Sequence, residues 1–203
     1  MKIFLANRID KEKPLKFQAG FSLIELVVSL SIIAMITVLF MSNYRNGNKR
    51  TDLVMTAQKI VADIHLAQNN ALGLVKYNNM VPAGGWGVAF DKSKNNYTIF
   101  ADLDSPGTGG YMVYASSTEG SINYGARLTT ISSGVYVSSL KIGSSGTSVN
   151  SANVSFLPPD PKTNIYSNGA TSTVLEIQIT ELGDINNHKT IRVNFLGLAE
   201  VID

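Results

Sequence analysis

The longest uncharged apolar stretch of the chain lies close to its N-terminus, from Leu26 to Tyr44, and is 19 residues long. As an α-helix it would extend roughly 28 Å, close to the thickness of the hydrocarbon core of a bilayer. The pattern therefore predicts a membrane-spanning helix over residues 21–44. A single carboxylate, Glu25, lies near the start of this helix.

A second apolar pattern follows the predicted span. Small and aliphatic residues recur at alternating steps of four and three, which is the spacing of one helix face: Leu53, Ala57, Ile60, Ile64, Ala67 and Ala71. Lys59, Asp63 and Gln68 are expected to lie off this stripe, and the helix is expected to end near Gly73. Together with the span, the pattern predicts one long helix over residues 21–72, roughly 78 Å if continuous.

From Lys76 onward the chain is rich in Gly, Ser, Thr, Asn and Tyr, with short alternations that are typical of β-strands. We expect two hairpins, one of residues 85–90 and 96–101, the other of residues 173–180 and 189–195 across a loop at 181–188. Further strands are expected at residues 111–115, 134–142, 153–157 and 198–202, with loops at 143–151 and 158–172. The predicted fold class is α+β, in which the second half of the helix packs on an antiparallel β-sheet in one head of about 130 residues.

The charge distribution supports an outward orientation of this head. Five basic and two acidic residues precede Phe21, so 12 basic and 13 acidic residues remain in the rest of the chain. The positive N-terminal segment is expected to stay on the cytoplasmic side and to direct the remainder outward. For the basic collar at residues 45–50 we favour contact with lipid headgroups over nucleic-acid binding.

Few residues could support catalysis or metal binding. The chain has no cysteine, and its two histidines, His65 and His188, form no convincing Ser-His-Asp set. No glycine-rich stretch has the spacing of a phosphate-binding loop. Asp102 and Asp104 faintly resemble a calcium loop but lack its later glutamate, so an Asx turn is the favoured interpretation. We expect a non-enzymatic protein without a cofactor or a metal site.

The order of segments at the N-terminus is unusual. In a secretory signal the small residues follow the apolar stretch, whereas here Ala19 and Gly20 precede it. The block Gly20-Phe21-Ser22-Leu23-Ile24-Glu25-Leu26 resembles the prepilin signal of type IV pilins and pseudopilins. The resemblance implies cleavage between Gly20 and Phe21, methylation of the new Phe21 amine, and assembly into a helical filament. The chain departs from that pattern at Ala19, where Lys or Arg is common, and in having no proline near residues 41–43.

Glu25 has two interpretations. A carboxylate near a helix N-terminus is favoured by the helix dipole and could simply lie at the level of the headgroups. Ionisable groups inside spanning segments are, however, usually functional. In the family that the block resembles, this glutamate pairs with the N-terminal amine of a neighbouring subunit, so we favour a role of Glu25 in assembly.

The head resembles one branch of this family. Residues 57–72, the strand Gly85-Trp86-Gly87-Val88-Ala89-Phe90 and the strand Val154-Ser155-Phe156 are similar to segments of minor pseudopilins and minor pilins of the GspH/FimT kind. The resemblance implies a type IV pilin-like fold. It also implies three parts: a cleaved leader (1–20), a transmembrane assembly helix (21–44), and a globular head with the amphipathic half of the helix (45–203).

The function implied by the resemblance is that of a structural minor pilin or pseudopilin. Its partners would be sibling subunits, the prepilin peptidase, an inner-membrane assembly platform and membrane lipid. The chain would cross the cytoplasmic membrane once, with its head outside, and would enter a periplasmic or extracellular filament. The sequence leaves open whether that filament is a type IV pilus, a type II secretion pseudopilus or a DNA-uptake pilus.

Two other functions compete with this one. A pilus-tip module for DNA uptake or adhesion is the main alternative, although the acidic C-terminal end, residues 198–203, argues against DNA as a partner. A membrane-anchored hydrolase is disfavoured because the catalytic set is missing.

Overall fold

The computed structural model describes residues 20, 22–104, 106–107, 110–114, 124–158 and 162–202, apart from the side chains of residues 42–48 and 124–126. Its contacts divide the chain into two compact units, one ending at Tyr44 and the other beginning at Arg45. The first unit contains the N-terminal part of helix α1 (Leu23–Leu72), and the second, which we call the head, contains the rest of that helix and all the described strands.

The beginning of α1 is set by Ser22. Its Oγ accepts a hydrogen bond from the N–H of Glu25 at 3.2 Å, and its carbonyl oxygen accepts one from the N–H of Leu26, also at 3.2 Å. Ser22 and Glu25 stand three residues apart, as in a capping box, in which the serine satisfies a backbone donor that the first helical turn leaves open. The local sequence thus explains why the helix starts at Leu23.

The C-terminal end of α1 lies in the head and agrees with the prediction. The helix ends at Leu72, and the next residues close it through hydrogen bonds from Gly73 N–H to the Asn69 carbonyl (2.8 Å) and from Val75 N–H to the Asn70 carbonyl (2.9 Å). All six residues of the predicted stripe are at most 2 % exposed. Asp63 was expected to lie off this stripe, yet it is buried as well, with 8 % of the residue exposed.

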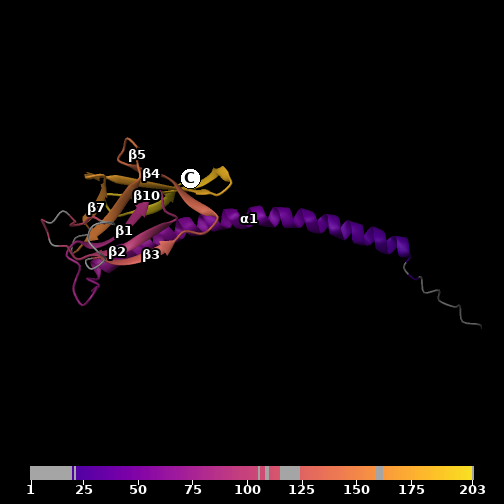
Figure 1. The fold of residues 1–203 in the computed structure, drawn as a ribbon, viewed down its shortest axis with the longest axis horizontal. Helices are drawn as coiled ribbons and strands as arrows, with labels where there is room; N and C mark the ends of the chain where they lie inside the picture. The colour runs from indigo at the N-terminus through magenta and orange to yellow at the C-terminus, as the bar shows by residue number, and fades with distance from the viewer. Residues whose placement is uncertain are drawn as a thin grey trace, which may run out of the picture. The chain divides into compact units, whose positions relative to one another are not determined.

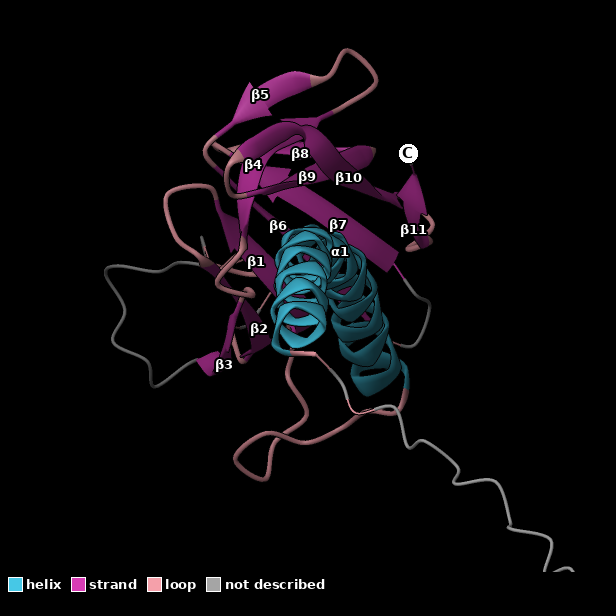
Figure 2. Cartoon of the chain, turned by 90° about the vertical axis from the view of Figure 1, so that its right-hand side faces the viewer, coloured by secondary structure: helices cyan, strands magenta, loops and turns pink. Residues whose placement is uncertain are grey.

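The strands form two antiparallel sheets (Figures 1 and 2) rather than the single sheet that the sequence predicted. The six-stranded sheet has the order β3-β2-β1-β6-β7-β8. Its strands are β1 (Gly85–Asp91), β2 (Asn96–Asp102), β3 (Tyr124–Thr130), β6 (Ser151–Leu157), β7 (Lys162–Ser167) and β8 (Ala170–Ser172). The five-stranded sheet has the order β11-β10-β9-β4-β5. Its strands are β4 (Val135–Ile142), β5 (Thr147–Val149), β9 (Val174–Glu181), β10 (Asp184–Asn194) and β11 (Ala199–Ile202).

One hydrophobic core joins both sheets to the stripe of α1. Strand β9 shows the alternation that makes this possible, because Leu175, Ile177 and Ile179 are completely buried while the residues between them are half-buried. From the six-stranded sheet, Val88 and Phe90 enter the same cluster. The α+β fold class is therefore confirmed, as is the packing of the amphipathic half of the helix on antiparallel strands.

Both predicted hairpins are present, with β1 paired to β2 and β9 paired to β10. The loop predicted at residues 181–188 is wrong, because β10 already begins at Asp184 after a turn at Leu182 and Gly183. Gly183 has a φ of 100°, a left-handed conformation that suits glycine in such a turn. The strands β5, β7 and β8 lie in stretches that the sequence predicted to be loops.

The strand predicted at residues 111–115 is also wrong for its described part, and Ala115 lies outside the described residues. Residues 111–114 form a turn, in which Met112 has a φ of 60°. The carbonyl oxygen of Met112 accepts hydrogen bonds from three side chains of β6 and β7: Asn153 Nδ2 (3.3 Å), Ser155 Oγ (2.9 Å) and Asn164 Nδ2 (3.1 Å). These hydrogen bonds from side chains satisfy the Met112 carbonyl, so this group does not need the backbone partner that it would have in a strand.

Candidate functional site

The predicted processing point lies just before the start of α1. Gly20 is exposed, and a Cβ built on it would meet no atom within 4 Å. Ser22 is exposed as well, whereas Phe21 and residues 1–19 lie outside the described residues. The described flanks of the Gly20–Phe21 bond are therefore open to an enzyme.

The segment that follows is long and apolar enough to cross a membrane. It runs from Leu23 to Met41 with a mean hydropathy of 2.6, and none of it is buried by the chain. Large apolar side chains such as Leu23 (82 % exposed) and Phe40 (71 % exposed) have no cover within the described residues. Their burial requires lipid or neighbouring helices.

The hydroxyl groups of this segment bond to its own backbone. Ser29 Oγ donates to the Glu25 carbonyl oxygen (2.8 Å), Ser31 Oγ to that of Val27 (2.8 Å), and Thr37 Oγ1 to that of Ile33 (2.7 Å). Such bonds satisfy polar groups inside a bilayer without an outside partner. The hydroxyls of the segment therefore fit an apolar environment. Its carboxylate differs from them, because a charged group in a bilayer needs a partner.

That carboxylate belongs to Glu25, which lies in the first turn of α1 and is exposed. The partial positive charge of a helix N-terminus favours an anion at this position. No ion pair joins Glu25 to another residue in the described part of the chain. The carboxylate is thus placed at the end of the helix nearest Phe21, on a surface that a neighbouring molecule can reach.

The structure also shows a polar cluster in the head that sequence reasoning missed. Asp63 on α1 accepts a hydrogen bond at Oδ2 from the phenol of Tyr97 (2.6 Å) and one at Oδ1 from Arg127 Nη2 (3.0 Å). Burial of Tyr97, followed by its hydrogen bond to Asp63, raises the pKa of the phenol well above its usual value of 10.0. The cluster attaches the helix to β2 and β3, so we assign it a role in holding the fold.

The second acidic feature of the head is Asp102, which the sequence linked to an Asx turn or a calcium loop. This side chain is completely buried, and its Oδ1 accepts the N–H of Asp104 at 2.8 Å, as in an Asx turn. Its Oδ2 accepts the N–H of Met112 at 2.5 Å. Burial raises the pKa of this carboxyl to about 6. Both oxygens therefore organise the backbone after β2, and the described residues contain no cluster of three metal-ligating side chains.

The two histidines do not form a site with these carboxylates. His65 is half-buried, and its Nδ1 lies 3.5 Å from Gln68 Oε1 on the same helix. His188 lies on β10, opposite Thr180 of β9. The described residues thus bring together neither a catalytic triad nor a metal centre, and the roles of Gly20, Phe21 and Glu25 in processing and assembly stay predictions.

Comparisons with curated proteins and with solved structures found no match. A family model described as the prokaryotic N-terminal methylation motif matches residues 15–41. The match includes the Gly20–Phe21 bond, Glu25 and the apolar segment up to Met41. The N-terminal segment of this chain therefore carries a type IV pilin-like prepilin signal, the mark of a protein that is processed and assembled with other pilin subunits.

Proposed function

We propose that the chain is a structural minor pilin or pseudopilin of a type IV pilus or a type II secretion pseudopilus. In this proposal residues 1–20 are a cleaved leader, residues 21–44 form the transmembrane assembly helix, and residues 45–203 form the head. The observation that carries the proposal is the match of residues 15–41 to the methylation motif, on a segment whose side chains the chain itself leaves uncovered.

Processing would create the charge that assembly uses. A cut between Gly20 and Phe21 produces an amine two residues before the first residue of α1. A cation at a helix N-terminus is disfavoured by the helix dipole, and a charge inside a low-dielectric bundle needs a partner. The carboxylate of Glu25, from the same subunit or a neighbour, can offset both costs.

Intact mass of the protein purified from membranes tests the processing step. We expect a chain that begins at Phe21 and carries one methyl group on its N-terminal amine. Gly20→Val is expected to retain the leader, because the bulkier side chain obstructs the peptidase at the scissile bond. Since the space around Gly20 is empty, this variant leaves the described structure intact. A wild-type product that retains residues 1–20, or one cut beyond Tyr44, would contradict the proposal.

The role of Glu25 is tested by incorporation into filaments. Glu25→Leu is expected to reach normal membrane levels, because an apolar helix enters lipid at least as easily. It should be poorly incorporated, since the partner of the Phe21 amine is lost. Glu25→Asp should be intermediate because its charge remains but reaches less far. The measurement is the ratio of this protein in sheared filaments to that in membranes.

Ser29→Ala is the matched control, since it lies one turn further along α1 and its hydroxyl bonds only to the carbonyl of Glu25 among the described residues. This variant should leave the ratio unchanged. An unchanged ratio in Glu25→Leu as well would mean that the carboxylate merely lies at the headgroup level.

We further propose that the head belongs to the GspH/FimT-like branch and lies outside the cytoplasm. The segment Gly85–Phe90 that suggested this branch lies in β1, between β2 and β6 of the six-stranded sheet. Protease added to intact spheroplasts should digest the head if it faces outward. Neighbouring genes for an outer-membrane secretin and secretion components would favour a pseudopilus, whereas genes for pilus assembly alone would favour a pilus.

A further inference from the structure

The six-stranded sheet has a second face, opposite to the one that enters the core. Side chains alternate along a strand, so Tyr97 and Ile99 of β2 enter the core while Thr98 and Phe100 point to the other side. A Cβ built on Gly87 would meet the ring of Phe100, which places Gly87 on this outer face too. The outer face is partly covered by the turn around Met112, which is held there by Asn153, Ser155 and Asn164.

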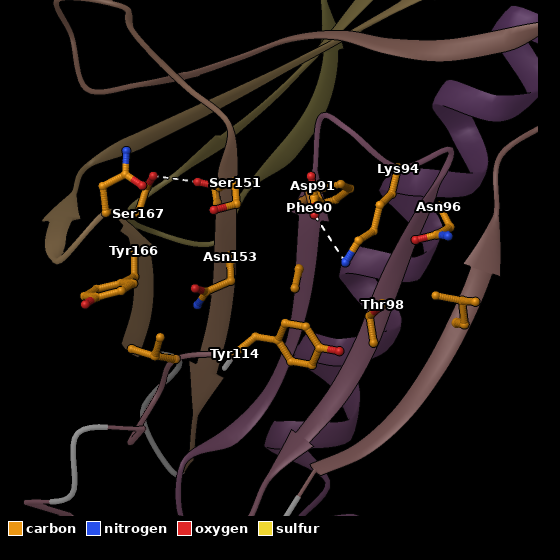
Figure 3. Close-up of a pocket in the computed structure, with 15 residues that line it drawn as sticks. Phe90, Asp91, Lys94, Asn96, Thr98, Tyr114, Ser151, Asn153, Tyr166 and Ser167 are labelled. Carbon is orange, nitrogen blue, oxygen red and sulfur yellow. Dashed lines mark hydrogen bonds and ion pairs between the residues drawn. The ribbon is translucent and has the colours of Figure 1, made fainter. Parts of the chain in front are cut away.

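Beside this turn the outer face is hollowed into an open cavity of about 230 Å³ (Figure 3). One row of paired residues crosses the sheet beneath it, in the order Leu128, Thr98, Ala89, Asn153 and Tyr166. All five residues line the cavity. The small side chain of Ala89 in the middle of the row, between larger neighbours, accounts for the depression.

Two tyrosines supply flat apolar surface to this cavity. Tyr114 follows the Met112 turn, and its ring packs against Phe100 with centroids 5.2 Å apart and planes inclined by 41°. Tyr166 comes from β7, next to Asn153 of β6. Both tyrosines are half-buried, and Figure 3 shows them around the same space as Asn153 and Thr98. Aromatic rings with a polar end suit ligands that have both an apolar face and hydroxyl groups.

The described polar groups that line the cavity carry no net charge. Lys94 Nζ forms an ion pair with Asp91 Oδ2 at 3.3 Å, and Asp91 Oδ1 also accepts hydrogen bonds from the N–H and the hydroxyl of Ser93. The other polar lining groups are amides and hydroxyls, including those of Asn96 and Thr98. An anionic ligand would have to displace Asp91 from Lys94, and a cationic ligand would have to displace Lys94 from Asp91. The ion pair therefore favours a neutral ligand.

We propose that this cavity binds a neutral saccharide, with one sugar ring in the cavity. A sugar ring offers a C–H face for a tyrosine ring, and hydroxyls that both donate to and accept from amides and alcohols. Pockets that enclose drug-sized ligands measure about 300 to 1,000 Å³, so a cavity of this size suits one ring, with the rest of an oligosaccharide outside. The site is independent of the N-terminal segment and would give the head a recognition role in addition to assembly.

The test uses the full chain in a zwitterionic detergent, because a detergent with a sugar headgroup would compete for the site. The protein is first applied to an array of neutral and anionic oligosaccharides, and binding is then measured by titration calorimetry. The neutral ligands are tested in two arms: oligomers of N-acetylglucosamine, and oligomers of hexoses without an acetamido group. The comparison shows whether the cavity recognises the acetamido group.

Tyr166→Ala and Asn96→Ala remove an apolar and a polar lining group from half-buried positions. We expect each to weaken binding about tenfold, the change that corresponds to about 1.4 kcal/mol. Tyr166→Phe should retain most of the affinity because the ring remains. The matched control is Tyr136→Ala, another half-buried tyrosine, which lies on β4 of the other sheet and should have no effect.

The expected result is binding in one of the two neutral arms that is lost in the lining variants and kept in the control. The proposal is overturned if neutral saccharides fail to bind, if anionic glycans are preferred, or if Tyr166→Ala and Asn96→Ala bind like the wild type. Equal loss in Tyr136→Ala would also overturn it, because the binding would then not depend on this cavity.

Discussion

Replacement of Tyr97 by phenylalanine should destabilise the head through the loss of one hydroxyl group. The phenol is buried, since Tyr97 is 1 % exposed, and it donates to Asp63 at 2.6 Å. Hydrogen bonds to charged groups contribute about 1.5–3 kcal/mol. The ring and its contact with Phe90, at a centroid distance of 5.6 Å, remain in Tyr97→Phe. We therefore expect a loss of about 2 kcal/mol in the free energy of unfolding.

Arg127, the other partner of Asp63, should contribute less than Tyr97 to the free energy of unfolding. Its side chain is 60 % exposed, and ion pairs that solvent reaches usually contribute less than about 1 kcal/mol. Arg127→Ala should thus destabilise the head by less than half the amount of Tyr97→Phe. Asp63→Ala should be the most severe, at about 3 kcal/mol, because it also leaves the phenol of Tyr97 buried without an acceptor.

The assay is urea unfolding of a soluble fragment that begins at Asn48, for the single variants and for Asp63→Ala combined with Tyr97→Phe. The double variant should be less destabilised than the two single losses together, with a coupling energy of about 1.5 kcal/mol. A pH series adds an independent readout, because the raised pKa of Tyr97 gives stability that is complete below pH 10 and declines at higher pH. Tyr97→Phe should lack this decline. A coupling energy near zero, or an effect of Arg127→Ala as large as that of Tyr97→Phe, would refute the reasoning.

Three further predictions concern the head. A fragment that begins at Lys76 should aggregate or melt without cooperativity, unlike the one from Asn48, because it loses the stripe of α1 and exposes apolar sheet surface; equal stability would contradict our description of the core. The free energy of unfolding should rise by about 1.3 kcal/mol as the pH is lowered from 7 to 5, because the Asp102 carboxyl has a pKa of about 6 when folded against 3.8 when unfolded; Asp102→Asn should flatten that dependence. The fragment from Asn48 should not shift DNA in a gel at moderate salt, and a shift that weakens steeply with added salt would support the tip-binding alternative.

The sequence predicted the parts of the fold that repeat a simple period. The stripe from Leu53 to Ala71 follows the helical period, and all six of its members are buried. Strand β9 alternates with period two and was predicted within one residue of its bounds. The six members of the stripe, and Leu175, Ile177 and Ile179 of β9, are both apolar and buried, so local pattern and tertiary packing agree at these positions.

Prediction failed where a polar group enters the interior or the backbone bonds to side chains. Asp63 lies off the apolar stripe, so the helical period does not predict its burial; it is buried because Tyr97 and Arg127 approach it from strands more than thirty residues away. Strand β7 follows a proline-rich stretch and carries few apolar residues, so it is identified by its pairing with β6 and β8 and not by a local pattern. The outer cavity combines β1, β2, β3, β6 and β7 with the residues after Met112, and no local pattern shows which strands become neighbours.

The attachment of the Met112 turn has a consequence for how the head can change in evolution. The hydrogen bonds that hold Met112 use its backbone N–H and carbonyl oxygen, so its attachment depends little on which side chains the neighbouring loop carries. The side chains that bind Met112 come from β2, β6 and β7, which are strands of one sheet. Insertions or exchanges next to Met112 can therefore accumulate without loosening the turn. The chain next to Met112 is therefore a position where the loop sequence can be replaced, in homologues or by design, while the sheet stays the same.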